Sequence, residues 1–316
     1  MEAPQSRLMT HFVRAFTHCR RTNIVSNIKG MLVAWSRFSG VLISSQSVAY
    51  ALGGTLTEQQ RLIAQAKGLE VHAKWLLDQI GVASGQRTAD VGCGPIGILN
   101  LLSAQVGRDG IVVGVEREPR FFDMAQAELD ARRLQNVKLV RADALHTGLE
   151  RSYYDFVHER LLLINFPPAS QHALLTEMIA LLKPGGTIAV QEFDSASYVC
   201  YPEHPSWDML VSIWNDTFHA AGGNEFVGRS IERLLRSAGV KNVSMKVHVE
   251  VAKVGEYRRT HLLSLLQSME DSVVASGRIT KTELKKHMAA LSEHLADPET
   301  TLIDKLIVQA WGQKRS

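Results

Sequence analysis

The pattern of apolar and polar residues becomes regular from about residue 58. Apolar side chains recur at helical spacing, and Gly81 ends the predicted helix; they are Leu62, Ile63, Ala66, Leu69, Ala73, Leu76, Leu77 and Ile80. Short apolar runs at 88–91, 111–116, 137–141, 156–158 and 187–191 then alternate with helical segments at 96–105, 121–134 and 171–182. This alternation predicts βαβ units, and therefore an α/β fold with a mostly parallel, doubly wound sheet.

The C-terminal third continues with a helical segment at 230–238, an alternating strand at 243–251 and two helical segments at 261–276 and 282–295. Thr280 and Glu283 form a capping-box pattern before the second of these. A last strand is predicted at 302–311. We therefore expect a basic N-terminal extension at 1–49 that could be helical, a core at 50–254, a helical lid inserted at 255–298, and the final strand of the core sheet within 299–316.

The first 45 residues are rich in basic side chains. Arg7, Arg14, Arg20, Arg21, Lys29 and Arg37 face a single acid, Glu2. This composition is typical of an organelle transit peptide, and it also suits a basic amphipathic extension that packs on the domain or on a partner chain. Composition alone leaves both interpretations open.

Composition narrows the class of protein. The chain has 316 residues, 45% hydrophobic residues and a net charge of +3, which is too small to indicate a nucleic-acid partner. Its longest apolar runs fall short of the roughly 18 residues that span a bilayer. Cys19, Cys93 and Cys200 lie far apart, so we expect neither a disulfide framework nor a metal site. A cytoplasmic protein is expected, with organelle targeting and a homodimer left open.

A glycine loop carries the strongest local signal. Gly92-x-Gly94-x-x-Gly97 follows a predicted strand and opens a helix, which satisfies the dinucleotide-binding fingerprint. Asp90 stands at the strand tip, where its charge would repel a pyrophosphate and suit a cationic ligand. Pro95 also removes one N–H donor from the loop. These two residues favour a ligand without phosphate.

Several further segments, in the same order, are similar to those of one family. Asp90-Val-Gly-Cys-Gly94 resembles the first motif of the class I S-adenosylmethionine-dependent methyltransferases. Glu116 ends the second strand like that family's ribose-binding acid, and Arg141-Ala-Asp143-Ala144 resembles the motif whose Asp meets the adenine amino group. Tyr154–Arg160 resembles the fourth strand, and Leu181-Leu-Lys-Pro-Gly-Gly186 the turn before the fifth.

The resemblance implies a Rossmann-like, mostly parallel seven-stranded sheet flanked by helices, with a helical cap, and S-adenosylmethionine as cofactor. Carboxylates suit this ligand because its adenosine half needs hydrogen-bond acceptors. Tyr50, with the helix that begins near Glu58, resembles a segment that folds over the cofactor in similar enzymes. The cofactor-binding residues expected are Tyr50, Asp90, Gly92, Cys93, Gly94, Glu116, Arg117, Asp143, Ala144 and Glu159.

Residues for the acceptor side are less well marked. His158, Asp194 and His219 follow predicted strands or lie beyond them, and they are the candidates for acid–base work. Each also has a structural interpretation, since Asp194 could cap a loop, His158 could be a satisfied histidine near the core and His219 could be structural. The Asn/Asp-Pro-Pro-Tyr motif of enzymes that methylate nucleic acid or glutamine is absent after the fourth strand. We therefore expect a small-molecule methyl acceptor of natural-product or quinone-like type; an NAD-dependent oxidoreductase and a non-catalytic binding protein are the alternatives.

Overall fold

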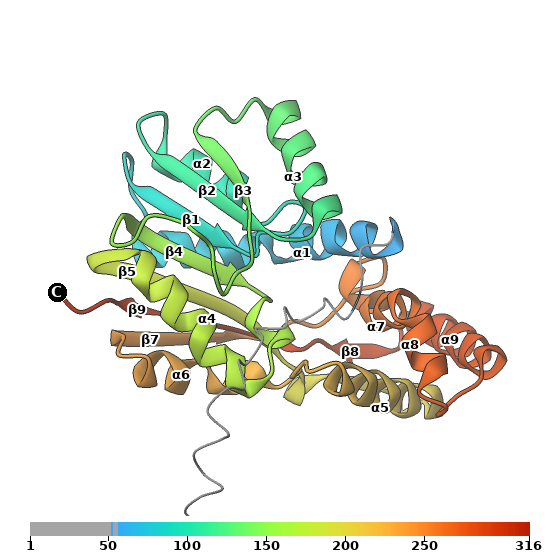
Figure 1. Cartoon of the computed structure of the whole chain (residues 1–316). Coiled ribbons are helices and arrows are strands. Elements are labelled where there is room, and N and C mark those ends of the chain that lie inside the picture. Colours follow the sequence, from blue (N-terminus) through green and yellow to red (C-terminus); the bar gives the residue numbers. More distant parts are fainter. Residues whose placement is uncertain (1–51, 53–55) are drawn as a thin grey trace, which may run out of the picture. The chain divides into compact units, whose positions relative to one another are not determined.

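The computed structural model describes residue 52 and residues 56–316, which fall in one compact unit. The predicted extension at 1–49 and Tyr50 lie outside the described residues. Within the described part, the alternation predicted from the sequence is present (Figure 1).

A seven-stranded sheet forms the centre of this unit, in the order β3-β2-β1-β4-β5-β9-β7. All neighbours pair in parallel except that β9 runs antiparallel to both β5 and β7. The strands are β1 (Arg87–Val91), β2 (Ile111–Glu116), β3 (Val137–Arg141), β4 (Tyr154–Arg160), β5 (Leu182–Asp194), β7 (Lys241–His248) and β9 (Leu306–Gln313). Strand order reverses between β1 and β4, and ligands bind at the carboxyl ends of strands near such a point.

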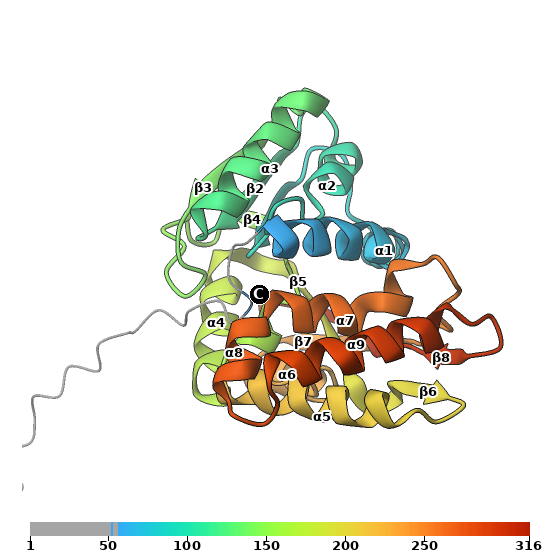
Figure 2. The same ribbon diagram turned by 90° about the vertical axis from the view of Figure 1, so that its right-hand side faces the viewer.

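Helices cover both faces of the sheet (Figure 2). One face carries α1 (Leu56–Ile80), α2 (Leu99–Val106) and α3 (Pro119–Arg132), and the other carries α4 (Pro168–Leu181) and α6 (Ile231–Ser237). Because both faces are covered, the central strands are nearly continuous runs of buried residues, as in β1 and β4.

A helical cap adds to this core. It consists of α5 (Pro205–Ala220), α7 (Tyr257–Ser268), α8 (Glu270–Ala275) and α9 (Lys281–Ala296), and α7 packs against α1. The last three helices fall within the segment predicted as a lid, whereas α5 has no counterpart in the sequence prediction. The capping box of α9 is confirmed, since Thr280 Oγ1 accepts from Glu283 N and the Glu283 carboxylate accepts from Thr280 N.

Three predicted strands differ in extent. The run predicted as one strand at 302–311 is two strands. The first, β8 (Thr301–Ile303), pairs with β6 (Val199–Tyr201). Asp304 and Lys305 separate it from β9, which pairs with β5 in the central sheet. The predicted turn around Gly185 is an irregularity within a longer β5, where the pairing with β4 shifts register. The strand predicted at 243–251 begins at Lys241 and ends at His248.

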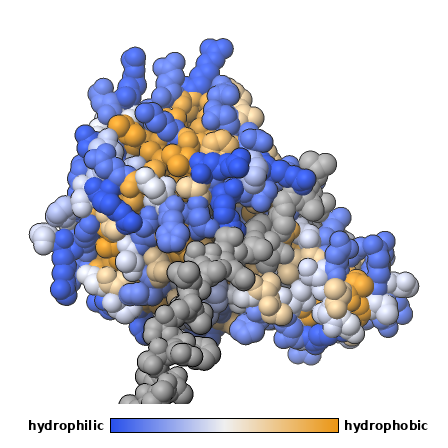
Figure 3. All heavy atoms as spheres, viewed as in Figure 1, coloured by the Kyte–Doolittle hydropathy of each residue, from blue (hydrophilic) through white to orange (hydrophobic). Residues whose placement is uncertain are grey.

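In Figure 3 hydrophilic residues cover most of the face shown, with hydrophobic residues in patches between them. Of the helices that the structure describes, none has the length and apolar character that crossing a membrane requires. The same described residues hold no cluster of three or more His, Cys, Asp or Glu side chains suited to a metal ion.

Candidate functional site

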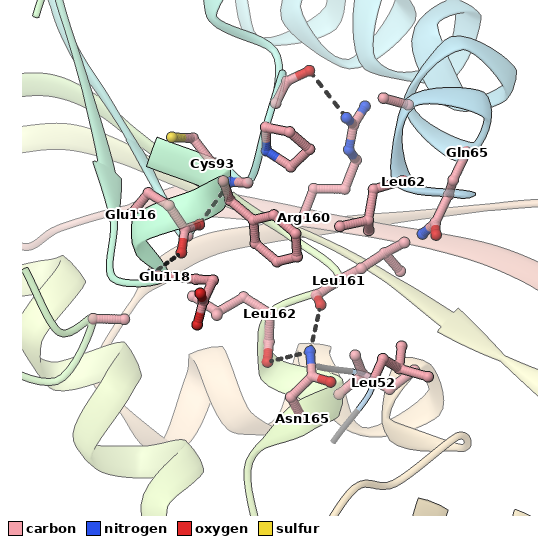
Figure 4. A pocket seen from close by; sticks show the side chains of 18 of the residues that line it. Leu52, Leu62, Gln65, Cys93, Glu116, Glu118, Arg160, Leu161, Leu162 and Asn165 are labelled. Carbon is pink, nitrogen blue, oxygen red and sulfur yellow. Dashed lines mark hydrogen bonds between the residues drawn. The ribbon is translucent and has the colours of Figure 1, made fainter. Parts of the chain in front are cut away.

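A pocket lies at the carboxyl edge of the sheet, and two kinds of wall line it. The ends of β1 and β2 and the loops after β1, β2 and β3 supply one wall, with Asp90, Gly92 to Gly97, Val115 to Glu118 and Ala142 to Ala144. The other wall is largely apolar and comes from α1, the loop after β4, α5 and α7. Figure 4 shows part of both walls, with Cys93 and Glu116 opposite Leu62 and Gln65 of α1.

The glycine loop after β1 has the conformation that its glycines permit. Gly92 and Gly94 have φ angles of +71° and +60°, which side chains rarely allow. A Cβ on Gly92 would lie 2.8 Å from the Leu162 side chain, whereas a Cβ on Gly94 would meet nothing within 4 Å. Because Gly94 also lines the pocket, the main chain there leaves room for a ligand to approach it closely.

Asp90 is buried at the tip of β1 and has two partners. Its Oδ2 accepts from the backbone N of Ile98 at 3.1 Å, and its Oδ1 lies 2.8 Å from His158 Nδ1. His158 is fully buried on β4 and does not line the pocket. The histidine therefore orients the Asp90 carboxylate from behind.

Glu116 ends β2 and holds two loops. Its Oε2 accepts from Gly94 N at 2.9 Å, and its Oε1 accepts from Glu118 N at 2.7 Å. Burial raises the pKa of Glu116, and these backbone hydrogen bonds oppose that rise. The carboxylate still lines the pocket, with lone pairs left to accept hydroxyl donors.

Asp143 and Ala144 line the pocket after β3, as predicted. Asp143 Oδ1 accepts from Leu145 N at 2.9 Å, and its Oδ2 accepts from Arg117 Nη1 at 3.0 Å. The side chain of Arg117, which is also in the predicted set, thus ties the loop after β2 to the loop after β3. Cys93 completes this group as a buried thiol whose pKa is raised by burial.

Glu159 lies outside the pocket lining, in contrast with the other described residues predicted to bind cofactor. Its Oε2 accepts from Leu162 N at 3.0 Å, and Glu192 on β5 accepts from Ile164 N at 3.1 Å. Glu159 Oε1 and Glu192 Oε2 are buried and have no donor among the described residues. Burial raises the pKa of both carboxyl groups, so the pair retains a proton more readily than exposed carboxyl groups do.

Asp194 and His219 also lie away from the pocket lining. Asp194 makes a bidentate ion pair with Arg229 at 2.7 Å and accepts a hydrogen bond from Ala196 N. Burial alone would raise the pKa of Asp194, but Arg229 and the backbone donors outweigh it and hold that pKa below the ordinary value. His219 sits on the exposed side of α5. Strand alternation explains the first case, since Phe193 faces the pocket and its neighbour points elsewhere.

A polar group centred on Arg61 lies in the apolar wall. The sequence predicted that the helix beginning near Glu58 folds over the cofactor, but it did not predict these contacts. Arg61 on α1 forms a bidentate pair with Glu58 at 2.6 Å and also donates to Gln65 and to Tyr257 on α7. His261 Nε2 lies 3.5 Å from Arg61 Nη1. Burial lowers the pKa of His261, helped by Lys305 and Arg61, so the ring is neutral and accepts from the guanidinium.

Lys305 is the second unpredicted group. It precedes β9, whose reversed direction brings its first residues to the carboxyl edge of the sheet beside the end of β5. Its Nζ lies 4.1 Å from the ring centre of Trp214 and 5.7 Å from that of Phe193, and all three residues line the pocket. The sequence did contain a signal for this site, because Asp304 and Lys305 interrupt an apolar run. The prediction of one continuous strand at 302–311 overlooked that interruption.

Comparison with known proteins identifies the family. The methyltransferase domain family matches residues 89–186. A demethylmenaquinone methyltransferase of Staphylococcus saprophyticus is 31% identical over 192 residues, which are 56% of this chain and 81% of that protein. The corresponding Geobacillus sp. (strain WCH70) protein is 29% identical over 190 residues, 55% of this chain and 80% of its own.

Solved structures agree at the level of the fold. A protein from Bacillus halodurans C-125 covers 77% of this chain and 99% of its own length, with a TM-score of 0.52 and 15% identity. The mostly parallel seven-stranded sheet, the glycine loop and the carboxylates at the ends of β2 and β3 are the features that the sequence motifs implied. The chain therefore belongs to the class I S-adenosylmethionine-dependent methyltransferases, whose methyl donor is S-adenosylmethionine.

Proposed function

We propose that the protein transfers a methyl group from S-adenosylmethionine to a small, largely apolar, quinone-like acceptor. One observation carries the proposal: the loops that suit the donor and a wall of apolar and aromatic side chains share a single pocket. The acceptor wall includes Leu62, Ile164, Phe193, Trp214, Phe218 and Leu265. The demethylmenaquinone methyltransferases that this chain resembles are named for an acceptor of this class.

The donor fits the residues of the first wall. Glu116 would accept from the ribose hydroxyls and Asp143 from the adenine amino group, while the open space at Gly94 admits the ligand beside the main chain. When bound, the donor supplies an activated methyl group on a sulfonium. The chain's own contribution is then to align the acceptor with that methyl group and to exclude water.

Catalysis in this proposal depends on positioning. His158, Asp194 and His219 do not line the pocket, so the proposal gives none of them direct contact with the acceptor. Glu159 supports the loop after β4 through Leu162 N, and Arg160 lines the pocket while donating to Gly97 O at 3.0 Å. A homodimer and the absence of a nucleic-acid partner stay predictions.

The test uses the full chain and measures binding and transfer separately. Calorimetry with S-adenosylhomocysteine is expected to show binding, with NADH as the negative control. The protein is then incubated with S-adenosylmethionine and a reduced naphthoquinone lacking the ring methyl, and mass spectrometry detects the added methyl group. Asp143→Ala serves as the donor-site control. Binding of S-adenosylhomocysteine with no transfer to any quinol or phenol offered would contradict the acceptor class.

A further inference from the structure

The ammonium group of Lys305 is buried, and no described residue provides it with an anionic partner. The residue is 2% exposed and lines the pocket, and among the described residues no hydrogen bond or ion pair to its Nζ is present. Its closest neighbours are the rings of Trp214 at 4.1 Å, Tyr198 at 5.0 Å and Phe193 at 5.7 Å. The faces of aromatic rings attract a cation. They do not replace the oxygen acceptors that the three N–H groups of an ammonium require.

None of the described charged groups around Lys305 forms an ion pair with its ammonium. Asp304 accepts from Lys305 N with Oδ1 and pairs with Arg258 through Oδ2 at 3.8 Å. Arg61 on α1 is balanced by Glu58. Glu225, in the segment after α5, attracts the ammonium from beyond ion-pair distance, and His261 on α7 is neutral.

A buried ammonium in such surroundings is poorly solvated. Burial lowers the pKa of Lys305 to about 8, although Asp304 opposes the effect. A ligand oxygen that carries negative charge would supply both the missing acceptor and the missing charge. The same wall offers Phe193, Trp214 and Phe218 for contact with a flat ring.

We propose that Lys305 forms an oxyanion subsite in the acceptor half of the pocket, which selects aromatic acceptors bound through an ionised ring hydroxyl. The inference rests on the proposed function and narrows its acceptor class to phenol- or enol-type compounds. The hydroxyl proton leaves to solvent, and the ammonium pairs with the oxyanion that remains. Lys305 thereby fixes which edge of the ring faces the donor wall.

The experiment compares two matched probes on the full chain saturated with S-adenosylhomocysteine. Hydroxynaphthoquinone has a ring hydroxyl that ionises at neutral pH, and its methyl ether has the same ring without the charge. The wild type is expected to bind the anion about tenfold or more tightly than the ether, as a charge-assisted hydrogen bond requires. Lys305→Met should remove that preference and leave the affinity for the ether and for S-adenosylhomocysteine unchanged.

Two further measurements guard against a misfolded variant. Lys305→Arg keeps the charge and should retain a preference for the anion. Absorbance titration of the bound hydroxynaphthoquinone should give a lower hydroxyl pKa in the wild type than in Lys305→Met. Equal preference in wild type and Lys305→Met, with the ether bound by both, would overturn the subsite alone. If neither probe binds the wild type, both the proposed quinone-like acceptor class and the proposed oxyanion subsite are contradicted.

Discussion

His158 Nδ1 lies 2.8 Å from Oδ1 of Asp90, so a fully buried imidazole on β4 supports the carboxylate at the tip of β1. The other carboxylate oxygen accepts from Ile98 N and so holds the start of α2. The pair connects the two strands between which the sheet order reverses. Its position behind the pocket suggests a role in shaping the glycine loop.

His158→Phe is expected to lower the free energy of unfolding by about 1–3 kcal/mol, since it leaves a buried carboxylate oxygen without its donor. Binding of S-adenosylhomocysteine should weaken as well, because Asp90 lines the pocket. Urea denaturation and calorimetry measure the two effects. His158→Asn places an amide nitrogen near the Nδ1 position and should recover most of the loss; a Phe variant as stable as the wild type would contradict the role.

Gly94→Ala tests the open space at the glycine loop. Gly94 lines the pocket, and a Cβ there would meet no atom of the described residues within 4 Å apart from its chain neighbours. We expect binding of S-adenosylhomocysteine to weaken about tenfold or more through overlap with the ligand. Gly85→Ala is the control, because Gly85 has φ +81° and an equally open Cβ position but does not line the pocket. The backbone penalty for alanine at positive φ, about 1–2 kcal/mol, should be similar in the two variants. Equal binding by the two variants would place the ligand away from Gly94.

Asp143→Ala removes the acceptor predicted for the adenine amino group and also the partner of Arg117 and Leu145 N. Binding of S-adenosylmethionine should weaken by about 1–3 kcal/mol, the range for leaving a buried donor unpaired. Asp143→Asn keeps an oxygen for Leu145 N and separates loop support from charge. Unchanged dissociation constants in both variants would remove Asp143 from the site.

The carboxyl pair Glu159–Glu192 makes stability depend on pH. Burial raises the pKa of both groups above the ordinary carboxyl value, so the folded protein retains a proton that the unfolded chain releases. The free energy of unfolding should therefore fall as pH rises through the range above that ordinary value. Glu192→Gln supplies a permanent donor and should flatten this dependence.

Denaturation between about pH 5 and about pH 9 measures the slope attributed to the pair. Glu232→Gln is the control, since Glu232 is an exposed partner of Arg236 and its substitution should leave the slope unchanged. If wild type and Glu192→Gln show the same slope, the two buried carboxyl groups do not retain a proton in the folded protein.

The sequence predicted much of the core because local patterns determine it. The strand β2 and the strand β3 match their predicted bounds, and the Thr280 capping box is present. The glycine loop and the carboxylates after β2 and β3 lie in one pocket because parallel strands bring their carboxyl ends to one edge.

The acceptor wall could not be predicted in the same way. It depends on which alternate side chain at a strand end faces the pocket, as Phe193 does and Asp194 does not. It also depends on contacts between distant segments, such as Arg61 with His261 and Lys305 with Trp214. Single-sequence periodicity carries no information on either point, and it joined β8 and β9 into one strand across Asp304 and Lys305.

The reversed direction of β9 has a consequence for the order in which the pocket is built. The donor loops all precede α4 along the chain, whereas Lys305 is the last of the pocket-lining residues. During synthesis on the ribosome the strands β1 to β4 emerge first, and the acceptor wall is completed only when β9 inserts between β5 and β7. The residues that suit the donor therefore leave the ribosome before Lys305, on which the acceptor wall depends.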